Sequence, residues 1–377
     1  MFLRPCFEGR AGWGASILNR WDPRPTRRAA KRNFQRRSAG FPRKFVGILI
    51  SGATGFVGSH LAQALVQAGE RVYALVRTSS DVSALQESEV QLIYNDHAED
   101  ADSFEAMLNA HPDIRMIYHL ASVLTLARLK YEDYQKINVE ITRNLLEASR
   151  RLQRLQAFVY CSSVGVIGPL PEIPANEQTR CAPDSYYAKT KYEAECLSLD
   201  YARNYNLPVT AVRLAWVYGP GDRRTFKIFE MIAKKHFAII GDGQTRISPM
   251  HVTDAAQALM LCAKQIDQTR GEAFIAAGNA PVPLAEFAAL IAKECGVSLP
   301  PFHIPAWLAK LAAQICEGIC VPIGVEPFIH HNRLNFFLRH QAFDISKIQR
   351  TVGYAPRVDL PDGIRETVAW YRKEGWI

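Results

Sequence analysis

The chain has no pair of cysteines at the spacing of a metal site. Its eight cysteines are scattered over 377 residues, and none of them forms a C-x-x-C pair. This spacing excludes the common structural zinc frameworks, and it is typical of buried, reduced thiols in a cytosolic protein. We therefore expect no metal and a cytoplasmic location.

The sequence also lacks a long uninterrupted apolar run. The nearest candidate, Pro305–Phe328, contains Lys310, Glu317, Pro322 and Pro327, so it does not match a simple transmembrane helix. We expect no membrane span, and peripheral contact with a membrane surface stays open.

Acidic residues are scarce only at the N-terminus. Residues 1–44 contain twelve Lys and Arg and two acidic residues, whereas residues 45–377 contain 33 basic and 35 acidic ones. The overall charge of +8 therefore sits in the first segment, and the rest, at about −2, gives no indication of a nucleic-acid partner. The segment lacks the apolar core of a secretory signal, and its composition predicts disorder. A targeting segment, a tether to an anionic surface and an upstream start site are the alternatives.

A glycine-rich turn follows the first apolar run. Residues 45–50 are typical of a buried strand and residues 60–65 of a helix, with Ser51–Gly58 (SGATGFVG) between them. Glycines here allow the sharp bend, the close approach of the backbone to a pyrophosphate and tight helix packing, while the first helical amides face the phosphates. The turn predicts a bound dinucleotide. The expected contacts are Gly52, Thr54, Gly55, Phe56, Val57 and Gly58.

Tyr187 and Lys191 lie four residues apart. On a helix this spacing puts the phenol and the ammonium on one face, where the cation should lower the pKa of Tyr187 toward neutrality and make it a general acid or base. Ser163 ends an apolar strand and offers a hydroxyl to the same substrate oxygen. Ser162 could share that role, but adjacent residues of a strand point to opposite faces, so only one serine should reach the site. A surface Tyr–Lys pair is the alternative.

In this order, the motifs resemble those of the extended short-chain dehydrogenases/reductases. The family's TGxxGxxG pattern matches the glycine turn, with Ser51 in place of the threonine, and its YxxxK pattern matches Tyr187 and Lys191. Further segments that fit are Tyr118–Ser122, Asn138–Ala148 (with Glu140 and Ile141 where the family usually has a glycine), Arg213–Asp222 and His251–Ala256.

The resemblance covers about residue 45 to the C-terminus and implies several further properties. It implies cofactor contacts at Leu120, Ala121 and Ser122. It also implies a homodimer formed through the helices that carry Asn138 and Tyr187.

Six apolar runs alternate with helical or polar stretches, which predicts an α/β fold with a doubly wound parallel sheet. The runs are residues 45–50, 72–76, 90–94, 116–120, 158–161 and 209–214. We expect a Rossmann domain over residues 45–220, with its sheet ending near Trp216, and a smaller, mainly helical C-terminal substrate cap over residues 221–377. The chain should return from the cap to the Rossmann core near residues 250–278 and in the C-terminal tail.

The end of the second strand bears on the choice of cofactor. A carboxylate there would bind the adenosine ribose, whereas Arg77 can pair with a 2′-phosphate, so we expect NADP to be preferred, with NAD as the alternative. A solvated arginine beside a plain ribose would look the same in sequence. Asp96, just past the third strand, is expected to contact the adenine amine or to cap the next helix.

The resemblance implies reversible hydride transfer between a nicotinamide and a secondary alcohol or ketone. In the oxidising direction Tyr187 takes the hydroxyl proton, Lys191 lowers its pKa and binds the nicotinamide ribose, and Ser163 orients the reacting oxygen. Asn138 either assists through its helix or caps a helical turn.

Two departures count against the nucleotide-sugar branch of the family. Its members usually have Asn in the segment RxxNVYG, where this chain has Trp216, and Arg246 lies five residues before His251 instead of four. A diphosphate needs fixed, charge-assisted donors. We therefore expect an enzyme resembling 3β-hydroxysteroid dehydrogenases, with an apolar alcohol as its small-molecule substrate.

A nucleotide-sugar 4-epimerase or dehydratase is the runner-up, because basic residues after the sixth strand can still hold a diphosphate. They are Arg223, Arg224, Lys227, Lys234 and Lys235. A non-catalytic dinucleotide-binding protein should have a broken triad, yet Ser163, Tyr187 and Lys191 are all present. Apolar residues of the cap can line a pocket, lie on a membrane or form ordinary core. They are Phe302, Trp307, Leu308, Leu311, Ile315, Ile319, Phe328, Phe336 and Phe337.

Overall fold

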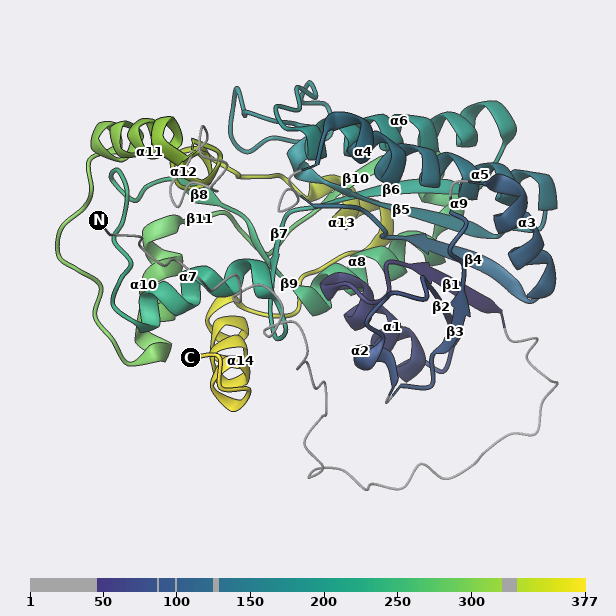
Figure 1. The fold of residues 1–377 in the computed structure, drawn as a ribbon, viewed down its shortest axis with the longest axis horizontal. Coiled ribbons are helices and arrows are strands. Elements are labelled where there is room, and N and C mark those ends of the chain that lie inside the picture. Colours follow the sequence, from purple (N-terminus) through teal and green to yellow (C-terminus); the bar gives the residue numbers. More distant parts are fainter. Residues whose placement is uncertain (1–45, 87, 99, 125–128, 321–330) are drawn as a thin grey trace, which may run out of the picture.

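A seven-stranded parallel sheet forms the centre of the molecule (Figure 1). The computed structural model describes residues 46–86, 88–98, 100–124, 129–320 and 331–377. The strands are β1 (Gly47–Ser51), β2 (Arg71–Val76), β3 (Gln91–Tyr94), β4 (Ile114–His119), β5 (Ala157–Ser163), β6 (Val209–Leu214) and β10 (Ala273–Ala276). Their order is β10-β6-β5-β4-β1-β2-β3. The order reverses between β1 and β4, and ligands of such sheets bind at the carboxyl ends of the strands there.

Helices cover both faces of the sheet, which confirms the predicted Rossmann fold. On one face lie α3 (Ala101–Ala110), α5 (Ile141–Leu152) and α6 (Tyr186–Tyr205), and on the other lie α1 (Phe56–Gln67), α8 (Val252–Lys264) and α13 (Ser346–Val352). An apolar core lies on each face of the sheet, and successive residues of a strand point to opposite cores. Leu49 packs toward α3 and α5, whereas Ile48 and Ile50 pack toward α1 and α8. Both faces are therefore dry, as expected for parallel strands.

The prediction that the sheet ends near Trp216 is wrong, because β10 adds a seventh strand beside β6. This strand has only four residues, and its pairing partner lies about sixty residues earlier in the chain. Two charged side chains cover its outer edge. The carboxylate of Glu177 accepts the backbone N–H of Ile275 at 2.8 Å, and Lys347 donates to the carbonyl of Ala273 at 2.7 Å. Charges on an edge strand discourage pairing with another chain.

The C-terminal cap, which lies beside the Rossmann part (Figure 1), has its own apolar core. Its helices α7 (Arg223–Ala233), α10 (Leu284–Cys295) and α14 (Leu360–Lys373) pack together around aromatic residues that include Phe229, Phe287 and Tyr371. Two small sheets join the cap to the Rossmann part: β7 (Trp216–Tyr218) with β9 (Pro249–His251), and β8 (Arg246–Ile247) with β11 (Val282–Pro283). The outer end of the cap carries α11 (Ala306–Cys320) and α12 (His331–Leu338).

The remaining short elements connect these parts. They are α2 (Ser83–Gln86), α4 (Tyr131–Gln135), a π-helical turn (Lys136–Glu140), a 3₁₀ turn (Val164–Val166) and α9 (Ile266–Thr269). The π-helical turn runs directly into α5, and single π turns inside helices are frequent at functional sites.

Candidate functional site

The glycine turn has the shape of a phosphate cradle. Gly52 has a φ of +76°, and a Cβ on it would lie 2.7 Å from the backbone nitrogen of Ala121. A Cβ on Gly58 would lie 2.1 Å from the carbonyl oxygen of Gly52. The turn therefore closes only with glycine at both positions. No side chain caps the start of α1 at Gly55, so the first amides of this helix are directed at the place where a pyrophosphate would lie.

The other predicted cofactor residues surround this turn. Thr54, Phe56 and Val57 are half-buried at the start of α1, and Leu120–Ser122 follow β4 beside Gly52. The backbone of Leu120 donates to the carbonyl of Ser51 at 3.0 Å, which joins the two strand ends. The arrangement fits a dinucleotide, and the individual contacts stay predictions.

The proposed catalytic side chains meet at the end of β5. Ser163 is the last residue of that strand, and its hydroxyl lies within hydrogen-bond reach of the phenol of Tyr187 on α6. Lys191, one turn further along α6, is 2 % exposed. Its ammonium donates to the carbonyl oxygen of Cys161 at 2.6 Å and lies 4.3 Å from the centre of the Tyr160 ring. Ser163, Tyr187 and Lys191 are thus brought together, as predicted.

The pKa of Tyr187 differs from the prediction. Burial raises it to about 12, and the charge of Arg224 and the nearby hydroxyl of Ser163 oppose this shift only in part. The expectation that Lys191 brings this pKa toward neutrality is therefore wrong for the chain by itself. The reason is that the burial of the phenol outweighs the charges around it, while the ammonium of Lys191 donates to the carbonyl of Cys161 and has its own pKa lowered to about 8 by burial. At neutral pH, Tyr187 holds its proton.

The two neighbouring serines have different surroundings. Ser163 reaches Tyr187, whereas the hydroxyl of Ser162 is 3 % exposed and has no hydrogen-bond partner among the described residues. This agrees with the expectation that only one of them serves the site.

A chain of buried hydrogen bonds connects the glycine turn to the catalytic helix. The Thr142 hydroxyl donates to the carbonyl of Asn138 at 2.7 Å, so it must accept from Nε2 of His119, 2.8 Å away. Nδ1 of His119 is then an acceptor and receives the hydroxyl proton of Ser51 at 2.5 Å. Burial lowers the pKa of His119 to about 3, so the ring is neutral and this tautomer is the one that the network requires.

Asn138 continues this network instead of capping its own helix. It lies in the π-helical turn, accepts the backbone N–H of Val123 at 2.8 Å and donates to the hydroxyl of Thr190 at 3.0 Å. Thr190 precedes Lys191 on α6. Thr190, as well as His119 and Thr142 in this role, could not be found from the sequence, because their partners are 23 to 68 residues away and no local pattern marks them.

Arg77 and Asp96, predicted to meet the adenosine part of the cofactor, lie near each other after β2 and β3. The Asp96 carboxylate accepts the backbone N–H and the hydroxyl of Thr78 at 2.9 and 2.7 Å. These bonds, with a smaller contribution from Arg77, hold the pKa of Asp96 below its usual value. The alternative that Asp96 caps the next helix is wrong, because Asp100 is the N-cap of α3. Its contact with adenine stays a prediction.

Trp216 is built into the cap core. Its indole N–H donates to the hydroxyl of Thr225 at 3.2 Å, and its ring lies 4.9 Å from that of Phe287. Arg246 is exposed, and its guanidinium donates to the carbonyl of Pro281 at 3.4 Å. The tryptophan therefore offers no free donor to a diphosphate from the ring nitrogen.

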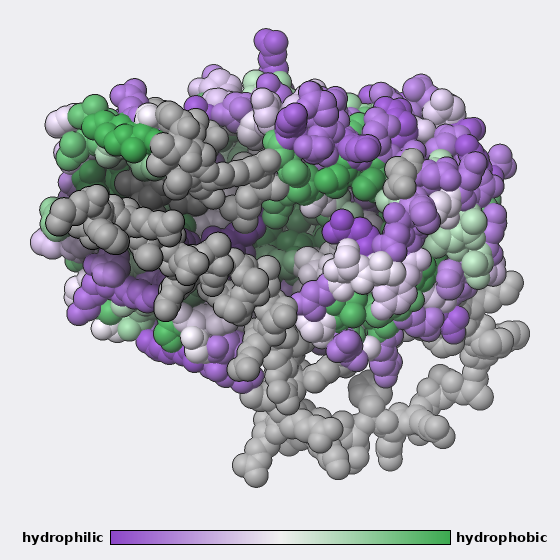
Figure 2. Space-filling model, viewed as in Figure 1, coloured by the Kyte–Doolittle hydropathy of each residue, from purple (hydrophilic) through white to green (hydrophobic). Residues whose placement is uncertain are grey.

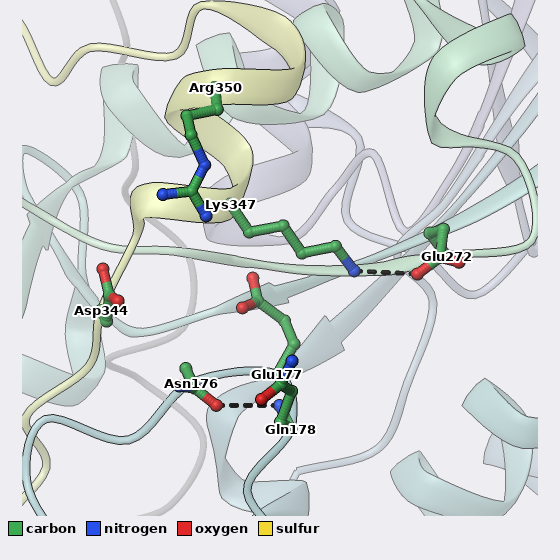
Figure 3. Close-up of a pocket in the computed structure, with 7 residues that line it drawn as sticks. All are labelled: Asn176, Glu177, Gln178, Glu272, Asp344, Lys347 and Arg350. Carbon is green, nitrogen blue, oxygen red and sulfur yellow. Dashed lines mark hydrogen bonds and ion pairs between the residues drawn. The ribbon is translucent and has the colours of Figure 1, made fainter.

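Figure 3 shows a separate polar pocket of about 490 Å³ beside β10. Lys347 from α13 points across it and forms an ion pair of 2.9 Å with Glu272, and Asn176 bonds to the backbone of Gln178. None of the predicted site residues lines this pocket, so it is separate from the dinucleotide cradle.

Comparison with known proteins places these features in context. The family model described as the NAD dependent epimerase/dehydratase family matches residues 48–277. A decarboxylating sterol-4-alpha-carboxylate 3-dehydrogenase of Candida albicans is 27 % identical over 354 residues, which cover 87 % of this chain and 98 % of that protein. A 3-beta-hydroxysteroid dehydrogenase of Mycolicibacterium neoaurum is 24 % identical over 339 residues, covering 86 % and 91 %.

The fold is also similar to that of solved structures. A UDP-glucuronic acid 4-epimerase of Bacillus cereus, solved with UDP-glucuronic acid and NAD, superposes with a TM-score of 0.69 at 23 % identity. The match covers 87 % of this chain and 99 % of that one. At this level of identity the likeness establishes the fold alone.

Proposed function

The chain belongs to the NAD-dependent epimerase/dehydratase family, among the extended short-chain dehydrogenases/reductases, and from this premise we propose that it transfers hydride between NAD(P) and a secondary alcohol or ketone of an apolar substrate. The observation that carries the proposal is that Ser163, at the end of β5, lies within reach of the phenol of Tyr187, with Lys191 buried one helical turn away. The nicotinamide supplies or accepts the hydride. Tyr187 moves the proton, and Ser163 orients the reacting oxygen.

The protonation of Tyr187 favours one direction at neutral pH. With a pKa of about 12, its phenol is ready to donate a proton to the oxygen of a ketone under reduction. Oxidation needs the phenolate. At pH values below the pKa, the phenolate fraction increases about tenfold for each unit by which the pH increases. Oxidation of an alcohol should therefore accelerate as the pH rises through the neutral range.

An apolar substrate is supported by the cap and by the relatives. Trp216 fills the position of the diphosphate-binding asparagine with a large ring whose N–H is engaged by Thr225. Relatives that align over most of the chain are named as dehydrogenases of sterols and steroids. Within this class we propose a 3β-hydroxysteroid or a similar apolar alcohol.

A nucleotide-sugar 4-epimerase is the second candidate, and one observation favours it. The guanidinium of Arg224 is exposed at the start of α7, and its charge reaches Tyr187. The charge of Arg223, beside it, contributes slightly to lowering the pKa of Asp81 in the loop after β2. The two cations are neighbours at the start of α7, where a diphosphate could pair with them.

The proposed function is tested by supplying NAD or NADP with 3β-hydroxysterols, simple secondary alcohols and UDP-sugars. Nicotinamide absorbance reports net reduction, and the sugars are analysed chemically. Net reduction by a sterol or alcohol, at least about a hundredfold slower in Tyr187→Phe, is the expected result. The matched control is Tyr186→Phe, since Tyr186 is the exposed neighbour on α6. Sugar interconversion without net reduction would establish the epimerase instead.

The preference for NADP is a finer part of the proposal and depends on Arg77. This residue is exposed directly after β2, where its guanidinium can meet a 2′-phosphate, although Asp96 competes for the same cation. Arg77→Asp should lower the affinity for NADPH at least about tenfold relative to NADH, with Arg77→Gln intermediate. An unchanged ratio of the two affinities would contradict this role. The homodimer and the cytoplasmic location stay predictions.

A further inference from the structure

The outer helix of the cap, α11, buries small residues and exposes large apolar ones. On α11 the small residues Ala309 and Ala313 face inward and are 7 % and 0 % exposed, whereas large apolar residues face outward. The outward set, with one residue from the preceding loop, is Phe302 (62 % exposed), Trp307 (67 %), Leu308 (44 %), Leu311 (44 %), Ile315 (55 %) and Ile319 (61 %). We call these six residues the docking face. In Figure 2 hydrophobic residues gather over α11 at the upper left. An ordinary surface helix buries such a stripe.

The size of the docking face limits what can cover it. With about 150 to 250 Å² for a fully exposed large side chain, the six residues expose roughly 600 Å² at the fractions observed. This reaches the upper limit of roughly 300 to 600 Å² for the largest patch on an ordinary monomer. It falls short of the about 800 Å² that each partner contributes to a standard protein interface. A second copy of the chain would need further contacts.

The chemistry of the docking face matches a lipid surface. Trp307 is of the residue type enriched at the level of lipid headgroups, and Phe302 is of a type found on the apolar face of interfacial helices. The exposed Lys310 can extend its ammonium to the headgroups. Glu317 is the only acid between residues 299 and 320, and it is half-buried, so no fully exposed carboxylate of this stretch would meet anionic lipid.

The helix can lie on a membrane but cannot cross one. It has 15 residues, which is about 22 Å of helix, against about 30 Å of hydrocarbon. Within the described part of the chain, every helix is too short or too polar for a span. A short apolar face of this kind lies in the plane of the interface.

Charge elsewhere in the chain complements an anionic surface. Residues 1–44 carry twelve Lys and Arg and two acidic residues. A weak apolar anchor and a polybasic stretch together give stable membrane attachment where either alone is marginal. We propose that the docking face of α11 seats the protein on an anionic lipid surface, with the basic N-terminal segment adding electrostatic attraction. This interaction is independent of the proposed reaction.

The test is co-sedimentation of the full-length protein with vesicles. Vesicles of phosphatidylcholine with phosphatidylserine should bind it, vesicles of phosphatidylcholine alone should bind it less, and added salt should weaken the difference. Trp307→Gln combined with Ile315→Gln should lower the partition coefficient at least about tenfold. The matched control replaces Tyr94 and Tyr205, which are 54 % and 53 % exposed away from the docking face, with Gln and should bind as the wild type does. Unchanged binding of the α11 variant would overturn the proposal.

A fluorescence measurement locates the contact. Brominated lipid in the vesicles should quench tryptophan emission of the wild type, and Trp307→Phe, which keeps the surface apolar, should bind but lose that part of the quenching. Equal quenching of both proteins would place the contact elsewhere.

Two other occupants of the docking face give distinct results without vesicles. If a second copy covers it, the α11 double variant will shift the mass measured by light scattering from dimer to monomer. If another part of the same chain covers it, Trp307 will be shielded from acrylamide in the free protein. Either result would contradict the lipid surface. The α11 double variant and Trp307→Phe are each checked for a thermal unfolding midpoint equal to that of the wild type.

Discussion

Replacing Lys191 by methionine should stabilise the folded chain at neutral pH while removing a catalytic group. Lys191 is 2 % exposed, and burial lowers its pKa to about 8, against about 10.4 for a free lysine. Below that range the folded state holds a buried ammonium that the unfolded state would solvate. The hydrogen bond to the Cys161 carbonyl and the Tyr160 ring recover only part of this cost.

The pKa difference sets the size of the effect. Between pH 8 and 10.4 the unfolded chain binds more protons at Lys191 than the folded chain does. The free energy of unfolding therefore decreases as the pH falls from about 10.4 through the folded pKa of about 8, and the full cost of the buried charge is present below that pH. At about 1.4 kcal/mol for each pKa unit, the cost of the buried charge is about 3 kcal/mol at pH 7 and under about 1 kcal/mol at pH 10. The free energy of unfolding of Lys191→Met minus that of the wild type should therefore fall by about 2 kcal/mol over this range.

The assay is urea unfolding of both proteins at several pH values from 7 to 10, under reducing conditions and without cofactor. Titration of tyrosines and cysteines affects both proteins and cancels in the difference. Lys189→Met, at an exposed position of the same helix, is the matched control and should show no such trend. A difference between Lys191→Met and wild type that stays constant within about 0.5 kcal/mol would refute the burial of a charged Lys191.

Two further substitutions test the cradle and the core. Gly58→Ala places a Cβ 2.1 Å from the carbonyl oxygen of Gly52, so the turn must open. The affinity for NADH and NADPH, measured by fluorescence titration, should therefore fall at least about tenfold. The control is Gly318→Ala, which has open space around it and should bind both cofactors as the wild type does. Arg213 and Glu195 form a buried ion pair of 2.6 Å with side-chain exposures of 6 % and 1 %, so Glu195→Gln should lower the free energy of unfolding by about 3 to 5 kcal/mol. Adding Arg213→Met should restore most of that loss in a double-mutant cycle, and strictly additive losses would contradict the pairing.

The local features of the fold were predictable from the sequence. The first six strands occupy nearly the predicted ranges, because a run of β-branched and aliphatic residues between polar stretches is itself the signal for a buried strand. The glycine turn was predictable for the same reason, since its geometry depends on residues that follow one another. β10 was missed because four residues, Ala273–Ala276, carry no pattern of their own and become a strand only beside β6.

The apolar residues predicted for the cap differ in whether they are buried or exposed. Phe337 packs into the cap core, 6.1 Å from the ring of Phe237, whereas the six residues of the docking face point to solvent. Phe328 and the side chain of Phe336 lie outside the described residues. The same residue types therefore form core in one segment and surface in another, and composition could not distinguish the two.

The sequence by itself determined the family, the doubly wound fold and the spacing of Tyr187 and Lys191, because each depends on residues close together in the chain. Only the tertiary structure decided how these groups behave. Burial by several elements raises the pKa of Tyr187 and lowers that of Lys191, and segments far apart in sequence supply the hydrogen bonds of His119. Solvation and hydrogen bonding depend on contacts between distant segments, and these exist only once the chain has folded.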